Sequence, residues 1–120
     1  MQSRALLFLL SGALLAGCAS DPGTKPEEEL QAARTAIGEA DSAEADAVEP
    51  ALLTAAREKV NSAEALIEEQ RYDEARRLLE QAEVDAQLAE ARALTQEVRN
   101  ELGDLRASID SLRRNLESQN

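Results

Sequence analysis

The chain has 120 residues, enough for one small domain, and a formal net charge of −11. This acidity argues against nucleic acid as a partner, because a basic face supplies most of that affinity, and against broad contact with anionic lipid headgroups. Histidine is absent, which removes a His-based triad, an imidazole general base and an imidazole metal ligand. We therefore expect no enzyme, no cofactor and no metal site.

Residues 1–17 have the layout of a secretory signal peptide. Met1 to Arg4 is short and positively charged, and the run from Ala5 to Gly17 is mostly apolar. As a helix this run would span about 20 Å, which is short of the roughly 30 Å hydrocarbon core of a bilayer. The pattern therefore predicts a cleaved leader and not a transmembrane helix.

The leader ends in four residues that closely resemble the bacterial lipobox. They are Leu15, Ala16, Gly17 and Cys18. The resemblance implies diacylglycerol transfer to the Cys18 thiol, cleavage before Cys18 and N-acylation, so that lipid on this cysteine anchors the mature chain to a membrane. An ordinary signal peptide followed by an unrelated cysteine is the competing interpretation, and the complete match disfavours it.

The residues after Cys18 predict where the anchored chain goes and how it is held. Ala19 stands where an aspartate favours inner-membrane retention. The lipoprotein resemblance therefore implies the outer membrane, facing the periplasm, with Asp21 leaving the periplasmic side of the inner membrane as the alternative. Residues 18–26 contain Gly, Ser, Thr and two prolines, a composition that predicts an extended, flexible tether.

Residues 27–120 are predicted to form one helical domain, whose first two helices cover about 27–44 and 50–70. Acidic residues at 27–29 open the first helix, where they complement the helix dipole, and Pro50 suits the first turn of the second. Residues 41–49 are acidic without a basic residue, and we interpret them as a fraying helix end and a loop. Apolar stripes mark both helices: Leu30, Ala33, Ile37 and Ala40, then Leu53, Ala56, Val60, Ala63 and Ile67.

A third helix is predicted over about 73–117, with Asp73 as its N-cap. Its first stripe is rich in alanine: Ala75, Leu79, Ala82, Ala86, Ala89 and Ala93. The short break at 70–73 makes the second and third helices an antiparallel hairpin. Gly103 lowers helix stability by about 1 kcal/mol relative to alanine. The spacing of the apolar residues is the same before and after it, so the helix is expected to continue.

The last part of this helix carries a stripe of larger apolar residues with no predicted cover. The stripe consists of Val98, Leu102, Leu105, Ile109, Leu112 and Leu116. The helix over 50–70 is less than half as long as its partner and does not reach this far. Either the first helix folds across part of the stripe, or a second copy pairs with it as a coiled coil.

Four arginines recur at every seventh residue beside this stripe: Arg92, Arg99, Arg106 and Arg113. If Leu102 is assigned to position a of a heptad, these arginines occupy position e. A row of positive charges at this position needs an acidic partner. One interpretation pairs the row with glutamates of the same chain, such as those of the acidic first helix. The other makes the seam and its arginines a surface for self-association or for a periplasmic protein partner.

The stretch from Ala55 through Arg71, Tyr72 and Asp73 to Ala93 resembles the domain-of-unknown-function family 4398, small lipoproteins of proteobacteria. The likeness covers most of residues 30 to 95. It implies two Ala-rich helices joined by a turn that contains tyrosine, and it brings no catalytic residue. Many members carry an aromatic–Ala–Pro motif before the second helix, whereas this chain has Val48–Glu49–Pro50.

Together these features predict an all-α fold: a short helix, an antiparallel helical hairpin and a long C-terminal helix that extends as a coiled-coil-like arm. The expected function is that of a membrane-anchored structural or adaptor lipoprotein of the cell envelope. Non-covalent association with peptidoglycan is the alternative. Covalent linkage is disfavoured, since it uses a C-terminal lysine and the only lysines here are Lys25 and Lys59.

Overall fold

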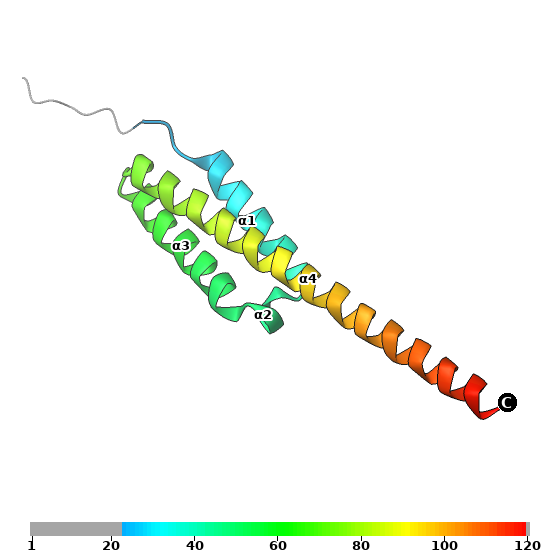
Figure 1. Cartoon of the computed structure of the whole chain (residues 1–120). Helices are drawn as coiled ribbons and strands as arrows, with labels where there is room; N and C mark the ends of the chain where they lie inside the picture. The colour runs from blue at the N-terminus through cyan, green and yellow to red at the C-terminus, as the bar shows by residue number, and fades with distance from the viewer. Residues whose placement is uncertain (1–22, 120) are drawn as a thin grey trace, which may run out of the picture.

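The computed structural model of the chain describes residues 23–119. They form helices α1 (Glu27–Ser42), α2 (Ala45–Val48), α3 (Pro50–Glu68) and α4 (Tyr72–Ser118) (Figure 1). No strand occurs within the described range, so the predicted all-α class is confirmed, together with the hairpin and the long C-terminal helix. The signal peptide, the lipobox residues and Cys18 lie outside the described residues.

Helix α4 is the central element of the bundle. Helices α1 and α3 both pack along its first half and contact each other less (Figure 1). The short turn after α3 makes α3 and α4 antiparallel. Helix α1 runs in the same direction as α4, because Glu29 near its start bonds to Arg76 near the start of α4, while Ala43 just past its end lies in one groove with Leu94.

The core between these helices is made almost entirely of alanine. All of its buried hydrophobic residues except Leu53, Val60 and Leu79 are alanines. Small side chains let helix backbones approach closely, but each one removes little apolar area from water. The bundle is therefore closely packed but thin, and its few large buried side chains carry a large share of the stabilisation.

The turn between α3 and α4 is a Schellman motif, the hydrogen-bonded helix end in which one residue is left-handed. The N–H of Gln70 donates to the Ile67 carbonyl over 3.0 Å, and the N–H of Arg71 donates to the Leu66 carbonyl over 2.9 Å. Gln70 takes the left-handed position with φ 59°. Glycine is the usual residue there, because a Cβ makes this conformation unfavourable.

Replacing Gln70 with glycine is therefore expected to raise the free energy of unfolding, by about 0.5–1 kcal/mol after the entropy cost of glycine in the unfolded chain. Urea unfolding followed by circular dichroism measures this. The control is Gln70→Ala, which keeps the Cβ and should give no gain. Equal stabilisation by both variants would contradict the argument.

Three details of the predicted helices are corrected by the structure. Helix α1 ends at Ser42, and residues 45–48, predicted as part of a loop, form the helical turn α2. Helix α3 ends at Glu68. Asp73 is not an N-cap: α4 already begins at Tyr72, with no side-chain cap at its start, so Asp73 lies in the first turn. There its charge still complements the helix dipole.

The last residues of the predicted tether lie against the bundle. Pro26 is among the largest fully buried side chains. The Arg76 guanidinium donates to the Thr24 carbonyl over 3.0 Å, to Glu29 Oε1 over 2.7 Å and to Asp73 Oδ1 over 3.1 Å. Arg76 thus fixes the entering chain and the start of α1 onto the start of α4.

Acidification is expected to weaken this attachment. A backbone hydrogen bond and the bond from Arg76 lower the pKa of Glu29 below its ordinary value. A carboxyl whose folded-state pKa is lowered adds stability above the unfolded pKa of about 4.3, and this is lost as pH falls through the folded-state pKa. Unfolding of Glu29→Gln measured against pH should therefore lose part of the acid-side slope. The exposed neighbour Glu28→Gln should keep it, and identical pH profiles of the two variants would contradict the assignment.

Candidate functional site

The distal part of α4 projects from the bundle with no other helix beside it (Figure 1). Every residue of α4 from Glu97 onward is exposed. We call residues 97–118 the arm, and at 1.5 Å per residue it is about 33 Å long. Helix α4 is continuous through Gly103, where a Cβ would meet nothing within 4 Å.

The predicted apolar stripe lies uncovered on this arm. Its six residues, from Val98 to Leu116, are between 43% and 65% exposed. Helix α1 ends beside the Ala93–Leu94 level of α4, where residues of both helices line shared grooves. The prediction that the first helix folds across part of the stripe is therefore wrong, because α1 is too short and too tightly seated on the first half of α4.

The exposed stripe also extends further back than the sequence analysis placed it. Val84 and Leu88, on the part of α4 inside the bundle, are 61% and 42% exposed. With Ala91 and Thr95, both exposed, they continue the spacing of the arm toward the N-terminus. We call the combined set the outer seam: Val84, Leu88, Ala91, Thr95, Val98, Leu102, Leu105, Ile109, Leu112 and Leu116.

Helix α4 therefore has two apolar seams on different faces. The inner seam, the alanine-rich stripe from Ala75 to Ala93, is buried against α1 and α3. At 100° per residue the outer seam lies about 170° around the helix from it, on nearly the opposite face. Beyond Ala93 the inner seam continues mainly with polar or charged residues, Gln96, Asn100, Asp110 and Arg114. The bundle ends where this seam stops being apolar.

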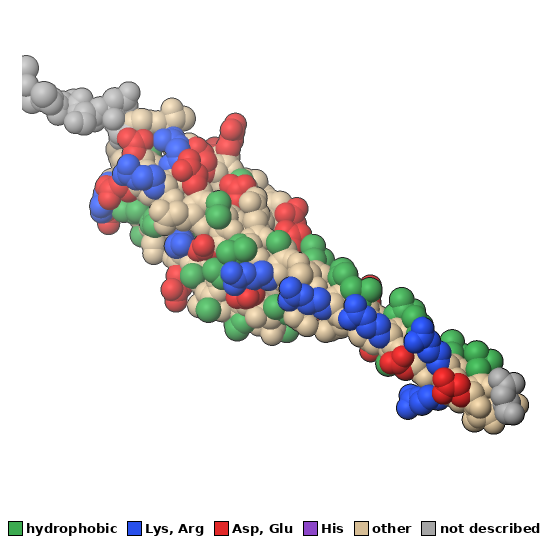
Figure 2. Space-filling view, in the orientation of Figure 1, with side chains coloured by type: hydrophobic (Ala, Val, Ile, Leu, Met, Phe, Trp, Pro, Cys, Tyr) green, Lys and Arg blue, Asp and Glu red, His purple; other side chains and the backbone are tan. Residues whose placement is uncertain are grey.

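The arginine row runs beside the outer seam (Figure 2). Arg92 Nη1 pairs with Glu49 Oε1 over 2.9 Å. In the described part of the chain no acidic side chain lies within ion-pair distance of Arg99, Arg106 or Arg113. The interpretation that glutamates of the same chain pair with the row holds for Arg92 and fails for the other three arginines, which lie at or beyond the end of the bundle.

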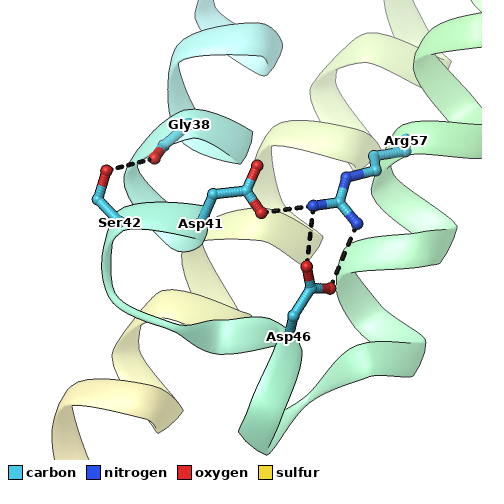
Figure 3. A network of polar contacts seen from close by, with 5 residues as sticks. All are labelled: Gly38, Asp41, Ser42, Asp46 and Arg57. Atoms are coloured by element: carbon cyan, nitrogen blue, oxygen red, sulfur yellow. Dashed lines mark hydrogen bonds and ion pairs between the residues drawn. The ribbon is translucent and has the colours of Figure 1, made fainter.

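The acidic segment after α1 is instead neutralised by Arg57 of α3 (Figure 3). Its guanidinium forms two bonds with the Asp46 carboxylate, of 3.3 and 3.2 Å, and a further ion pair with Asp41. The bond with Asp46, followed by the charges of both aspartates, raises the pKa of Arg57. This contact ties α1, α2 and α3 together, and explains why the segment is ordered where the sequence suggested fraying.

A groove of about 470 Å³ lies where the arm leaves the bundle, between α2 and α4. It is lined by polar and acidic side chains, among them Glu44, Glu97, Glu101 and Asp104. Within residues 23–119 no three metal-ligating side chains are grouped to hold a metal ion. No helix in this range is both long and apolar enough to cross a membrane. The candidate functional surface is the outer seam, because its large apolar side chains are exposed.

The profile of the family described as a domain of unknown function, DUF4398, matches residues 28–105. The chain belongs to the DUF4398 family. The match covers the bundle and the first part of the arm, and confirms the resemblance inferred from the Ala-rich helices and the tyrosine turn.

A DUF4398 protein of Pseudomonas aeruginosa, known from a crystal structure, has the same fold. It is 36% identical to this chain, with a TM-score of 0.75, over 81% of this chain and 100% of the other. No curated protein matches this DUF4398 chain. The family membership thus establishes the helical architecture and assigns no activity.

Proposed function

We propose that this DUF4398 protein is a lipid-anchored structural or adaptor protein of the bacterial cell envelope, and that it acts by protein contact and not by catalysis. The observation that carries the proposal is the outer seam: a row made mostly of large apolar side chains, about half exposed, on a helix that projects from its bundle. Exposed apolar surface of this extent is typical of a protein-binding site.

The predicted lipid anchor would orient the outer seam relative to the membrane. If Cys18 carries lipid, residues 19–22 separate it from the docked chain, and four extended residues span at most about 14 Å. The start of α4 is then close to the membrane, since Thr24 is bonded to Arg76 in its second turn. The full helix is about 70 Å long, so the arm would present its seam well away from the bilayer.

The anchor is tested by Cys18→Ser in the full-length chain. We expect the wild-type protein to incorporate labelled palmitate and to sediment with membranes, and the variant to do neither. Membrane association of Cys18→Ser equal to wild type would contradict the proposal.

Sorting to the outer membrane, with the domain facing the periplasm, is the second part of the proposal and depends on Ala19. Density-gradient separation of the two membranes should place the wild type in the outer-membrane fraction. Ala19→Asp should move most of the protein to the inner-membrane fraction, whereas Ala19→Ser should not. A wild-type protein found in the inner membrane would overturn this part.

Contact through the arm is tested by a photocrosslinking amino acid placed in the full-length chain in cells. At Leu105 or Ile109, on the seam, we expect a discrete protein adduct. At Asn100 or Ala107, which are exposed but lie off the seam, we expect none. The same weak adducts at all four positions would count against a binding surface.

Non-covalent association with peptidoglycan is the alternative function. A helix about 70 Å long that starts near the membrane would reach well into the periplasm. Sedimentation of the purified protein with sacculi tests it. Pelleting that Leu105→Glu does not reduce would favour this alternative over protein contact through the seam.

A further inference from the structure

We infer that the partner of the outer seam is a second copy of this chain, paired with the first in parallel along α4 as a two-stranded coiled coil. The inference deepens the proposed function and rests on it, because it names what the exposed seam binds. It draws on the length of the seam, its position relative to α1 and α3, and the charges on its two sides.

The outer seam keeps one heptad register from end to end. From Val84 to Leu116 its residues alternate at spacings of four and three, over more than the three to four heptads that indicate a coiled coil. The a positions are Leu88, Thr95, Leu102, Ile109 and Leu116. The d positions are Val84, Ala91, Val98, Leu105 and Leu112. In one heptad, isoleucine at a (Ile109) with leucine at d (Leu112) is the combination that favours two strands.

The neighbouring helices leave the whole seam accessible. Helix α3 lies on the e side of α4, where Lys59 and Glu49 pair with Asp85 and Arg92. Helix α1 lies on the other side, where Gly38 and Ala43 share a groove with Leu94. The a and d positions between these sides stay exposed even inside the bundle, so a second copy can pair with α4 over the bundle as well as over the arm.

The charges beside the seam favour the parallel orientation. The e positions from 92 onward are all arginine, whereas the g positions are Gln87, Leu94, Glu101, Ser108 and Asn115. In an antiparallel pair e faces e, and arginines would face arginines, which is unfavourable. In a parallel pair g faces e of the next heptad in the other copy. Glu101 of each copy then lies opposite Arg106 of the other copy, and no two like charges lie opposite each other.

Symmetry makes this pairing self-complementary. A two-fold axis along the coiled coil places identical seam residues opposite each other, so one surface serves both copies. Lipid anchors at the N-terminal end of both mature chains would also favour the parallel orientation of the two α4 helices. An unrelated acidic helix would also suit the arginine row, but it would leave Glu101 facing like charge.

Disulfide crosslinking in the full-length, membrane-bound protein tests the inference. Single cysteines are placed near the two ends of the seam, Val84→Cys in one variant and Leu112→Cys in another. Under mild oxidation each is expected to form a disulfide-linked homodimer, at least tenfold above Ala107→Cys, which lies on the opposite face of the same helix. Adding Leu105→Glu to Leu112→Cys should return that dimer to the level of the control.

Each outcome decides the question. Homodimers from both end positions support parallel pairing. A disulfide that forms only when Val84→Cys and Leu112→Cys are mixed would show antiparallel pairing and overturn the inference. Levels no higher than Ala107→Cys would also overturn it. If Leu105 then still photocrosslinks to a different protein, the proposed adaptor function stands without the homodimer. If Cys18→Ser remains membrane-bound or the seam crosslinks to nothing, the proposed function itself fails.

Discussion

Truncating Leu79 to alanine is expected to lower the free energy of unfolding by about 2–5 kcal/mol, the range for a buried leucine. Leu79 is fully buried in α4 and is one of only three core residues larger than alanine. Most of the buried core residues are alanines, which have no side-chain length to fill the space that it would leave. Domains are stable by only about 5–15 kcal/mol, so the variant should unfold at a clearly lower urea concentration than the wild type.

Urea unfolding followed by circular dichroism measures the effect, with Leu79→Met as the matched control. Methionine keeps nearly the same volume, and a swap of this kind usually costs less than about 1.5 kcal/mol. A loss that is large for alanine and small for methionine would show that the volume of this side chain matters. Equal losses would contradict the view that an alanine-rich core depends on its few large residues.

Enlarging Ala86 to leucine is the second substitution expected to have a large effect. Ala86 is fully buried in the inner seam of α4, where small side chains let α1 and α3 approach its backbone. Three extra carbon atoms at this point must displace a neighbouring helix, and overpacking typically costs about 1–3 kcal/mol. Because two helices pack on this face, we expect the upper end of that range.

Ala107→Leu is the control for this substitution. Ala107 lies in the same helix three heptads further on, at the same heptad position, but it is exposed on the arm. The change there is expected to alter stability by no more than about 0.5 kcal/mol. Chemical denaturation of both variants decides the matter. If Ala107→Leu is as damaging as Ala86→Leu, the inner seam does not end at Ala93.

Much of this fold could be predicted from the sequence because helices follow local rules. The apolar period places α1, α3 and α4, and Pro50 and the break at 70–73 locate two of the boundaries. The errors came where local signals were weak or misleading. Residues 45–48 are too few to show an apolar period, yet they form α2, where Asp46 is bound by Arg57 of the following helix.

The candidate site was predicted only in part. The arm stripe from Val98 to Leu116 is exposed on a projecting helix, but its continuation through Val84 and Leu88 was missed. Between residues 75 and 95 α4 carries apolar residues on two faces. Their spacings interleave along the chain, so periodicity alone does not separate the buried face from the free one.

By itself the sequence determined the helical class, the hairpin, the continuity of α4 and the register of both seams, because these depend on residues a few positions apart. Only the tertiary structure decided which seam is buried. Side-chain size alone would favour burying the larger leucine and valine residues, yet the alanine seam forms the core. The reason is that α1 and α3 are too short to follow α4 beyond Ala93, and they pack closely only where its face is small.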